Sequence, residues 1–354
     1  MKKMNKYLLL SIVVLFALFL MTACNDESES TGGEIDTQEN NMGEVSIEGP
    51  IKINESIPSD TEIISKGPNG GEKAVSAHSI ELTEEEVAKI REGNYTAAIA
   101  MHYAGNDWSR AQINGLEDTF KKMGIEILTV TDGQFSAEKQ MSDIETILGM
   151  DPDILVSIPV DAVSSAAAYR KAVDQGVKIV FMDNVAEGFT PSEDYVSVVS
   201  ADNYGNGGVE AAHLMAEQLG GKGKIGVIYH DADFFVTGQR VEAFEATIEN
   251  EYPEIEIVER GGIADASEGE SVANSMITRT PPDLDGMFVV WDVPAEGALS
   301  AIRTAGLDDV VVTTIDLGTP VALDMAKGQH VKGWELNYHM HKVLPKQSLL
   351  VIRY

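Results

Sequence analysis

The sequence predicts an α/β protein with two doubly wound parallel-sheet lobes joined by a hinge. From about residue 95, apolar runs of strand length alternate with amphipathic helical stretches at a spacing of roughly 25–35 residues. Several runs, such as residues 154–158, are apolar at almost every position, which is typical of strands buried on both faces of a parallel sheet. Nine such runs are more than one sheet usually holds, so we expect two sheets, each in its own lobe.

The predicted elements follow this alternation in order. The nine strands are expected at residues 95–103, 125–131, 153–159, 178–184, 195–202, 224–230, 254–260, 286–292 and 310–316. The helices between them are expected to begin near Trp108, Ser136, Asp161, Tyr204, Thr237, Ser267, Pro294 and Thr319. On this basis, residues 94–199 make the N-terminal α/β lobe and residues 200–331 make the C-terminal α/β lobe.

Residues 1–23 have the pattern of an export signal. Lysines at positions 2, 3 and 6 precede an apolar run over residues 7–21, which is shorter than the roughly 18–20 residues that span a bilayer. The next residues, Met-Thr-Ala-Cys, resemble a bacterial lipobox, and this resemblance implies cleavage before Cys24 and lipidation of its thiol. A buried free cysteine is the alternative. We therefore expect an exported protein, lipid-anchored to the cell membrane on its extracellular face or in the periplasm.

Residues 24–92 are predicted to be an acidic tether. Residues 25–92 hold 17 Asp and Glu against 5 Lys and Arg, with too little apolar surface to offset the entropy of ordering. Thr83 and Glu86 have the spacing of a capping box, which predicts a short helix near residues 83–91.

Composition and motifs exclude several classes of protein. The formal charge of −31 counts against nucleic-acid binding, because phosphate contacts need clustered Lys and Arg. A single cysteine excludes an intramolecular disulfide framework and a Cys-rich zinc site. No GxSxG, HExxH or GxxxxGK[ST] motif is present, and the glycines at 205, 207 and 208 lack the last glycine of a dinucleotide-binding loop. We expect no enzyme activity, no catalytic residues, no cofactor and no metal site.

Polar and aromatic side chains gather where the predicted strands end. They are Asn106 and Trp108 after the first strand, Asp183 and Asn184 at the fourth, Phe235 after the sixth, Trp291 and Asp292 at the eighth, and Asp316 at the ninth. Ligands of open parallel sheets bind beyond the carboxyl ends of the strands, so these residues are candidates for one site. Carboxylates and amides pair with hydroxyls, and aromatic rings cover the apolar face of a sugar ring. The alternatives are helix N-caps for the Asp residues and plain core positions for the tryptophans.

Residues 95–333 resemble the bacterial periplasmic sugar-binding proteins of ABC importers, which have the type I fold of the ribose- and galactose-binding proteins. The resemblance rests on a hinge-like crossing at residues 195–203, on Arg240 followed by Ala243-Phe244, on Trp291-Asp292 and on Thr314-Ile315-Asp316. It implies a monomer that captures a sugar or polyol in the interlobe cleft and delivers it to a membrane permease. Closure would occur at hinges near residues 200–203 and 316–318.

The resemblance also implies roles for single residues. Asn106, Trp108, Asp183 and Asn184 would face the sugar from the first lobe, and Trp291 or Asp292, with Asp316, from the second. Ribose binders carry an arginine where this chain has Gly238, and Phe235 is a candidate to fill the space of that arginine. They carry a second aromatic residue where this chain has Ser109. Both departures argue against ribose itself.

The C-terminal residues 332–354 depart from the family pattern, which returns to the first lobe through a Gly-Ala-Gln-x-Pro segment. Read one base early, from the third base of the Gly333 codon, the codons of residues 334–342 permit Leu-Gly-Ala-Gln-Leu-Pro-Tyr-Ala-Gln. We therefore expect that a one-base frameshift has replaced the native end with an aberrant tail, leaving the first sheet without its closing strand. A divergent tail is the alternative.

Two other functions stay open. A tethered sugar receptor that signals to a chemoreceptor or a sensor kinase would use the same lobes, and neighbouring genes for a permease and an ATPase would favour transport instead. A nucleotide-cofactor enzyme of Rossmann type is the less favoured alternative.

Overall fold

A computed structural model describes residues 51–52, 64–68, 74–77, 80–279, 284–331 and 350–352, all of which lie in one compact unit, residues 47–354. The predicted signal sequence, Cys24 and residues 332–349 of the predicted tail lie outside the described residues. None of the helices in the described part is long and apolar enough to cross a lipid bilayer.

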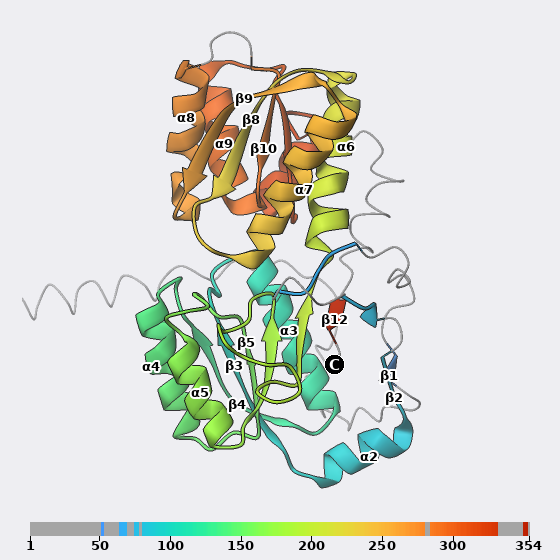
Figure 1. Ribbon diagram of the computed structural model, residues 1–354, viewed down its shortest axis with the longest axis vertical. Coiled ribbons are helices and arrows are strands. Elements are labelled where there is room, and N and C mark those ends of the chain that lie inside the picture. Colours follow the sequence, from blue (N-terminus) through green and yellow to red (C-terminus); the bar gives the residue numbers. More distant parts are fainter. Residues whose placement is uncertain are drawn as a thin grey trace, which may run out of the picture. The chain divides into compact units, whose positions relative to one another are not determined.

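The first lobe is built on a six-stranded sheet with the order β12-β7-β6-β5-β3-β4 (Figure 1). Its strands are β3 (Thr96–Met101), β4 (Glu126–Asp132), β5 (Ile154–Ser157), β6 (Lys178–Met182), β7 (Ser197–Ser200) and β12 (Leu350–Ile352). The first five pair in parallel. Strand β12 pairs antiparallel with β7, so the edge that was expected to lack a closing strand carries one at these residues. The three tail residues are aliphatic, a composition that suits a strand at a sheet edge.

The second lobe is built on a four-stranded parallel sheet with the order β11-β10-β8-β9. Its strands are β8 (Lys222–His230), β9 (Glu254–Ile263), β10 (Gly286–Val289) and β11 (Val311–Thr314). Each of the nine strands predicted from apolar runs is present, with ends within three residues of the expected ones.

Helices cover both faces of each sheet, as the predicted doubly wound fold requires. In the first lobe they are α3 (Asp107–Lys122), α4 (Ala137–Leu148) and α5 (Ala166–Asp174). In the second they are η2 (Asn203–Val209), α6 (Glu210–Leu219), α7 (Phe235–Glu251), η3 (Ala266–Glu268), α8 (Gly269–Arg279), α9 (Asp292–Ala305) and α10 (Thr319–Ala326). Figure 1 shows α8 and α9 on one side of the second sheet and α6 and α7 on the other.

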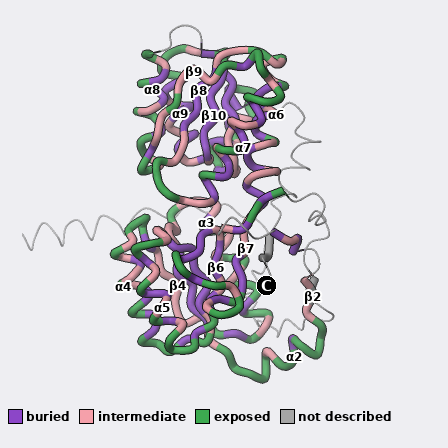
Figure 2. Tube along the Cα trace, in the orientation of Figure 1, coloured by how far each residue is buried: buried purple, intermediate pink, exposed green. Residues whose placement is uncertain are grey.

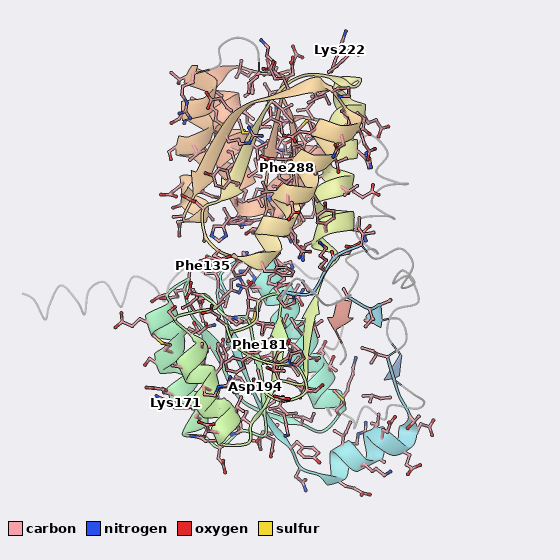
Figure 3. The ribbon with its side chains drawn as sticks, in the orientation of Figure 1. Phe135, Lys171, Phe181, Asp194, Lys222 and Phe288 are labelled. Atoms are coloured by element: carbon pink, nitrogen blue, oxygen red, sulfur yellow. The ribbon has the colours of Figure 1, made fainter. Side chains whose placement is uncertain are left out.

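Each lobe has its own core, with one apolar cluster on each face of its sheet. In the first lobe, Phe181 belongs to the cluster under α4 and α5, and Phe120 of α3 belongs to the cluster on the opposite face. In the second lobe, Phe288 stacks on Phe244 of α7 with ring centroids 4.0 Å apart. Figure 2 shows the buried strands inside each lobe, and Figure 3 labels Phe181 and Phe288 within the two cores. The fold class is therefore confirmed as α/β with two parallel-sheet lobes.

Two predicted helix starts differ from the structure. The helix expected near Asp161 begins at Ala166, because the Asp161 carboxylate accepts hydrogen bonds from Ser164 and holds a turn before the helix. The helix expected near Tyr204 begins as the π-helical turn η2. There a Cβ on Gly208 would lie 2.3 Å from the Arg240 carbonyl oxygen, so this glycine allows η2 to approach α7 closely. Backbone packing thus accounts for Gly208, one of the three glycines compared above with a dinucleotide-binding loop.

The chain before the first lobe also contains regular structure. Strands β1 (Ile51–Lys52) and β2 (Glu81–Leu82) pair antiparallel, and α2 (Glu84–Glu92) follows with the capping box between Thr83 and Glu86. Arg91 of α2 donates hydrogen bonds to the Lys122 carbonyl oxygen at the end of α3. The acidic segment therefore includes residues that contact the lobe.

Candidate ligand-binding site

A hydrogen-bonded chain of five side chains connects the carboxyl ends of the two sheets. Ser200, the last residue of β7, donates to Asp183 Oδ1 (2.6 Å) and accepts from Asn203 Nδ2 (3.1 Å). Asn203 Oδ1 accepts from Arg240 Nε (2.9 Å), and Arg240 Nη1 donates to Asp316 Oδ2 (3.0 Å). We call these five residues the hinge network, because the chain crosses from the first lobe to the second within it.

The backbone at two of these carboxylates is left-handed. Asp183 follows β6 with φ of 57°, and Asp316 follows β11 with φ of 70°. Asp and Asn adopt this region more readily than other residues with a side chain, although at some cost in energy. The conformation turns the chain sharply at the end of each strand.

Burial perturbs two carboxylates of the site. Burial raises the pKa of Asp183 to about 6, against the hydrogen bond from Ser200 and the charge of Arg240. Burial also raises the pKa of Asp292 to about 6, and repulsion from Asp316 adds to the effect. Asp292 Oδ2 accepts from the Gly318 backbone N–H at 2.5 Å. Carboxylates with a pKa below 7 are mostly ionised at neutral pH and accept hydrogen bonds from ligand hydroxyls.

Aromatic side chains from both lobes lie close together at the same strand ends. His102, directly after β3, meets the Trp108 ring edge-on at a centroid distance of 6.2 Å and stacks with Phe234 of the second lobe at 6.0 Å. His230, at the end of β8, meets the Trp291 ring edge-on at 5.3 Å. The rings form one set that can cover the apolar face of a carbohydrate.

Burial favours the neutral form of the two histidines of this set. It lowers the pKa of His102 to about 4, with His230 lowering it further and Asp132 raising it. Burial also lowers the pKa of His230, against the charge of Asp231. Nδ1 of His102 is buried and has no hydrogen-bond partner among the described residues. Such an atom is available to pair with a ligand hydroxyl.

Direct hydrogen bonds also join the two lobes. Asn184 Oδ1 accepts from the Phe235 backbone N–H at the start of α7 (3.2 Å). Asp107 Oδ2 accepts from the backbone N–H (3.1 Å) and Oγ1 (2.8 Å) of Thr319 at the start of α10. These contacts hold the carboxyl ends of the two sheets against each other.

The structure places the eight residues proposed from sequence in different roles. Asp183 and Asp316 belong to the hinge network, and Trp108 and Trp291 belong to the aromatic set. Asn184 and Phe235 bond to each other across the lobes, and Asp292 is 3% exposed beside Asp316. Asn106 is the N-cap of α3, where its Oδ1 accepts from the Ser109 backbone N–H, a role that the sequence had left open only for the Asp residues.

The candidates proposed from sequence leave out five residues of this arrangement: His102, Ser200, Asn203, His230 and Phe234. Each lies within four residues of the end of a predicted strand, which is a signal that could have identified it. Arg240 was noted for its motif alone, although the structure makes it the cation of the hinge network.

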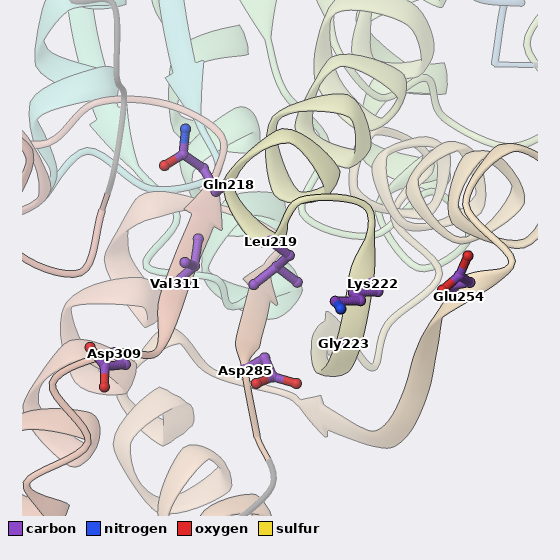
Figure 4. A pocket seen from close by; sticks show the side chains of 8 residues that line it. All are labelled: Gln218, Leu219, Lys222, Gly223, Glu254, Asp285, Asp309 and Val311. Atoms are coloured by element: carbon purple, nitrogen blue, oxygen red, sulfur yellow. The ribbon is translucent and has the colours of Figure 1, made fainter.

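A pocket with a volume of about 640 Å³ lies elsewhere, at the amino ends of the second lobe's strands (Figure 4). Its lining includes Lys222, Glu254, Asp285 and Val311, at or next to the first residues of β8, β9, β10 and β11. Parallel sheets bind ligands at the opposite edge, so we do not assign the ligand to this pocket. Within the described ranges, no three or more His, Cys, Asp or Glu residues are grouped as they would be to hold a metal ion.

Two α/β lobes, with polar and aromatic side chains meeting at the carboxyl ends of both sheets, define a solute-binding protein. A family model described as the periplasmic binding protein domain matches residues 82–334, and the chain belongs to this family. This result confirms the resemblance found in the sequence.

Individual relatives are similar to most of the two lobes. The ribose import binding protein RbsB of Bacillus subtilis (strain 168) is 26% identical over 218 residues, 62% of this chain and 68% of the relative. The xylitol-binding protein of Mycolicibacterium smegmatis is 25% identical over 201 residues, 56% of each protein. A periplasmic solute-binding protein of an ABC transporter from Actinobacillus succinogenes, solved with bound D-allose, superposes with a TM-score of 0.58 at 25% identity. The superposition covers 66% of this chain and 82% of that structure.

Proposed function

We propose that this chain is the extracytoplasmic solute-binding protein of an ABC-type importer, and that it captures a sugar or polyol and delivers it to the membrane permease. The observation that carries the proposal is the hinge network, which joins carboxylates of both lobes, together with the aromatic set at the same strand ends. A carbohydrate site needs carboxylates that bond to the hydroxyl groups and aromatic rings that cover the apolar C–H face. The family consists of binding proteins, and this supports a role without catalysis.

The ligand is proposed to differ from ribose. Ser109 stands where ribose binders have a second aromatic, and its buried Oγ has no hydrogen-bond partner among the described residues. Gly238 stands where they have an arginine. The Ser109 hydroxyl and the missing guanidinium change the polar groups available to a ligand, and this argues against ribose itself.

Isothermal titration tests the proposal directly. Purified protein without its first 23 residues is titrated with D-ribose, D-allose, xylitol and myo-inositol. We expect one of these ligands to bind with a Kd near 1 µM, which corresponds to about 8 kcal/mol, and D-ribose to bind more weakly. Absence of binding to any sugar or polyol in a wider panel would refute the function, and tightest binding to D-ribose would refute the specificity.

The membrane anchor is part of the proposal. Cys24 would carry the lipid that keeps the receptor next to its permease, as a monomer on the outer face of the membrane or in the periplasm. Cells that express the full chain, either with Cys24 intact or as the Cys24→Ser variant, are fractionated. We expect the intact protein to sediment with membranes and to incorporate a labelled fatty acid, and the variant to do neither. A labelled Cys24→Ser protein would disprove lipidation at this residue.

The chemoreceptor role is not favoured, because two of the similar proteins are named as a ribose import binding protein and as a solute-binding protein of an ABC transporter. We also propose that the lobes comprise residues 94–199 and 200–331 and that residues 332–354 are a frameshifted tail.

A further inference from the structure

Residues that precede the family domain pack on the lobes. The domain match begins at residue 82, yet Ser65 is 3% exposed and Ala74 and Ala77 are fully buried. The sequence suggested a solvated tether here. Burial of small residues from this segment shows that part of it belongs to the folded receptor.

Ser65 contacts the beginning of the second lobe. Its hydroxyl donates to Asp202 Oδ1 (2.5 Å) and accepts from the Tyr204 backbone N–H (3.1 Å). Asp202 is 2% exposed and caps η2 by accepting from the Gly205 backbone N–H (3.1 Å). Ser65 therefore completes the N-terminal cap of η2 from a position 137 residues away in the chain.

The same segment contacts the first lobe. Ala74 lies in the core cluster that includes Tyr195 and Val198, and Ala77 packs with Val199 of β7. The segment thus touches β7 before the crossing and η2 after it. It is a noncovalent connection across the hinge, beside the covalent one at residues 200–203.

The contact with Asp202 lies one residue from the hinge network. Asn203 is 1% exposed, and its side chain joins Ser200 to Arg240. We propose that residues 64–68 and 74–77 form a strap that holds the hinge in the arrangement in which Asn203 makes both bonds. Ser65 is then a positioning residue for ligand binding, and this part of the inference rests on the proposed function.

A positioning role changes the apparent affinity. If the strap raises the fraction of protein in the binding-competent arrangement, its loss lowers that fraction. The apparent Kd then rises by the same factor by which the fraction falls. Ser65→Ala removes two buried hydrogen bonds, so we expect an apparent Kd about threefold to tenfold higher. Ser65→Thr keeps the hydroxyl and is expected to restore the wild-type value.

Hydrogen exchange tests the strap without any ligand. The exchange rate of the Tyr204 amide is measured in the mature full-length protein and in Ser65→Ala and Ser65→Thr. We expect about tenfold faster exchange in Ser65→Ala and a wild-type rate in Ser65→Thr. The control is Ser157→Ala, which removes a fully buried hydroxyl bonded to the Ala100 carbonyl oxygen and Tyr169 in the first lobe core. Equal Tyr204 exchange in Ser65→Ala and wild type would overturn the strap.

Titration of the same variants with D-allose, xylitol, myo-inositol and D-ribose tests the positioning role. We expect Ser65→Ala to bind more weakly and Ser157→Ala to lose thermal stability with an unchanged Kd. Faster Tyr204 exchange with an unchanged Kd in Ser65→Ala would overturn positioning. If wild-type protein binds none of these ligands and none of a wider panel of sugars and polyols, the proposed function fails, and the positioning role fails with it. The exchange rates still decide whether the strap exists.

Discussion

Replacing Asp292 by asparagine is expected to stabilise the ligand-free protein at neutral pH. Asp292 is 3% exposed, and burial and the charge of Asp316 raise the pKa of its carboxyl from an ordinary 3.8 to about 6. Because the folded pKa lies above the unfolded one, the folded protein binds more protons between about pH 4 and 6, and its free energy of unfolding falls as pH rises through this window. The gap corresponds to about 3 kcal/mol at pH 7.5.

Asp292→Asn removes this cost and keeps an oxygen for the Gly318 backbone N–H. We expect the free energy of unfolding at pH 7.5 to rise by about 1–3 kcal/mol, with a difference about one third as large at pH 4.5. The assay is urea unfolding followed by circular dichroism at pH 4.5, 5.5, 6.5 and 7.5. A variant that is less stable than wild type at pH 7.5, or that shows the same pH slope, would refute the reasoning.

Asp265→Asn provides a control of opposite sign. Asp265 caps η3, and hydrogen bonds from Ser267 lower the pKa of its carboxyl. Its stabilising effect is present above the unfolded pKa and is lost as pH falls through the folded pKa. Asp265→Asn should therefore weaken the protein at pH 7.5 and converge with wild type in acid.

Three further predictions concern the site and the tail. Trp108→Ala and Asp183→Ala should each weaken sugar binding at least tenfold in titration while circular dichroism shows a folded protein, and near-normal affinity in both would contradict the site. Arg240→Lys should lower the free energy of unfolding by about 2 kcal/mol in urea, since the buried bonds to Asn203 and Asp316 need the guanidinium; an unchanged value would show that the pair is dispensable. Sequencing the gene across codons 327–354 should reveal one extra base near codon 333, and a confirmed reading with an early stop in the shifted frame would make the tail genuine.

The sequence predicted the strands better than the side-chain roles. Continuous apolar runs identify buried strands directly, because every position faces a layer of helices. The Arg240–Asp316 pair joins residues 76 apart, and no local pattern predicts such a partner. Asn106 illustrates the ambiguity at strand ends, since an N-cap and a ligand contact require the same residue type in the same place.

The N-terminal segment shows another limit of sequence reasoning. Acidic composition correctly signals a polar chain, but Ser65, Ala74 and Ala77 are small residues whose burial depends on the surface against which they lie. That surface, β7 and the start of η2, is more than a hundred residues further along the chain.

The left-handed backbone at Asp183 and Asp316 restricts any redesign of the receptor for a new ligand. At φ of 57° and 70°, Gly, Asn and Asp cost the least backbone strain, so mutant libraries at these two positions are best limited to these three residues. Trp108 on α3 is under no such restriction. An engineer who wants a biosensor for another carbohydrate should therefore diversify the rings and leave the two turns as they are.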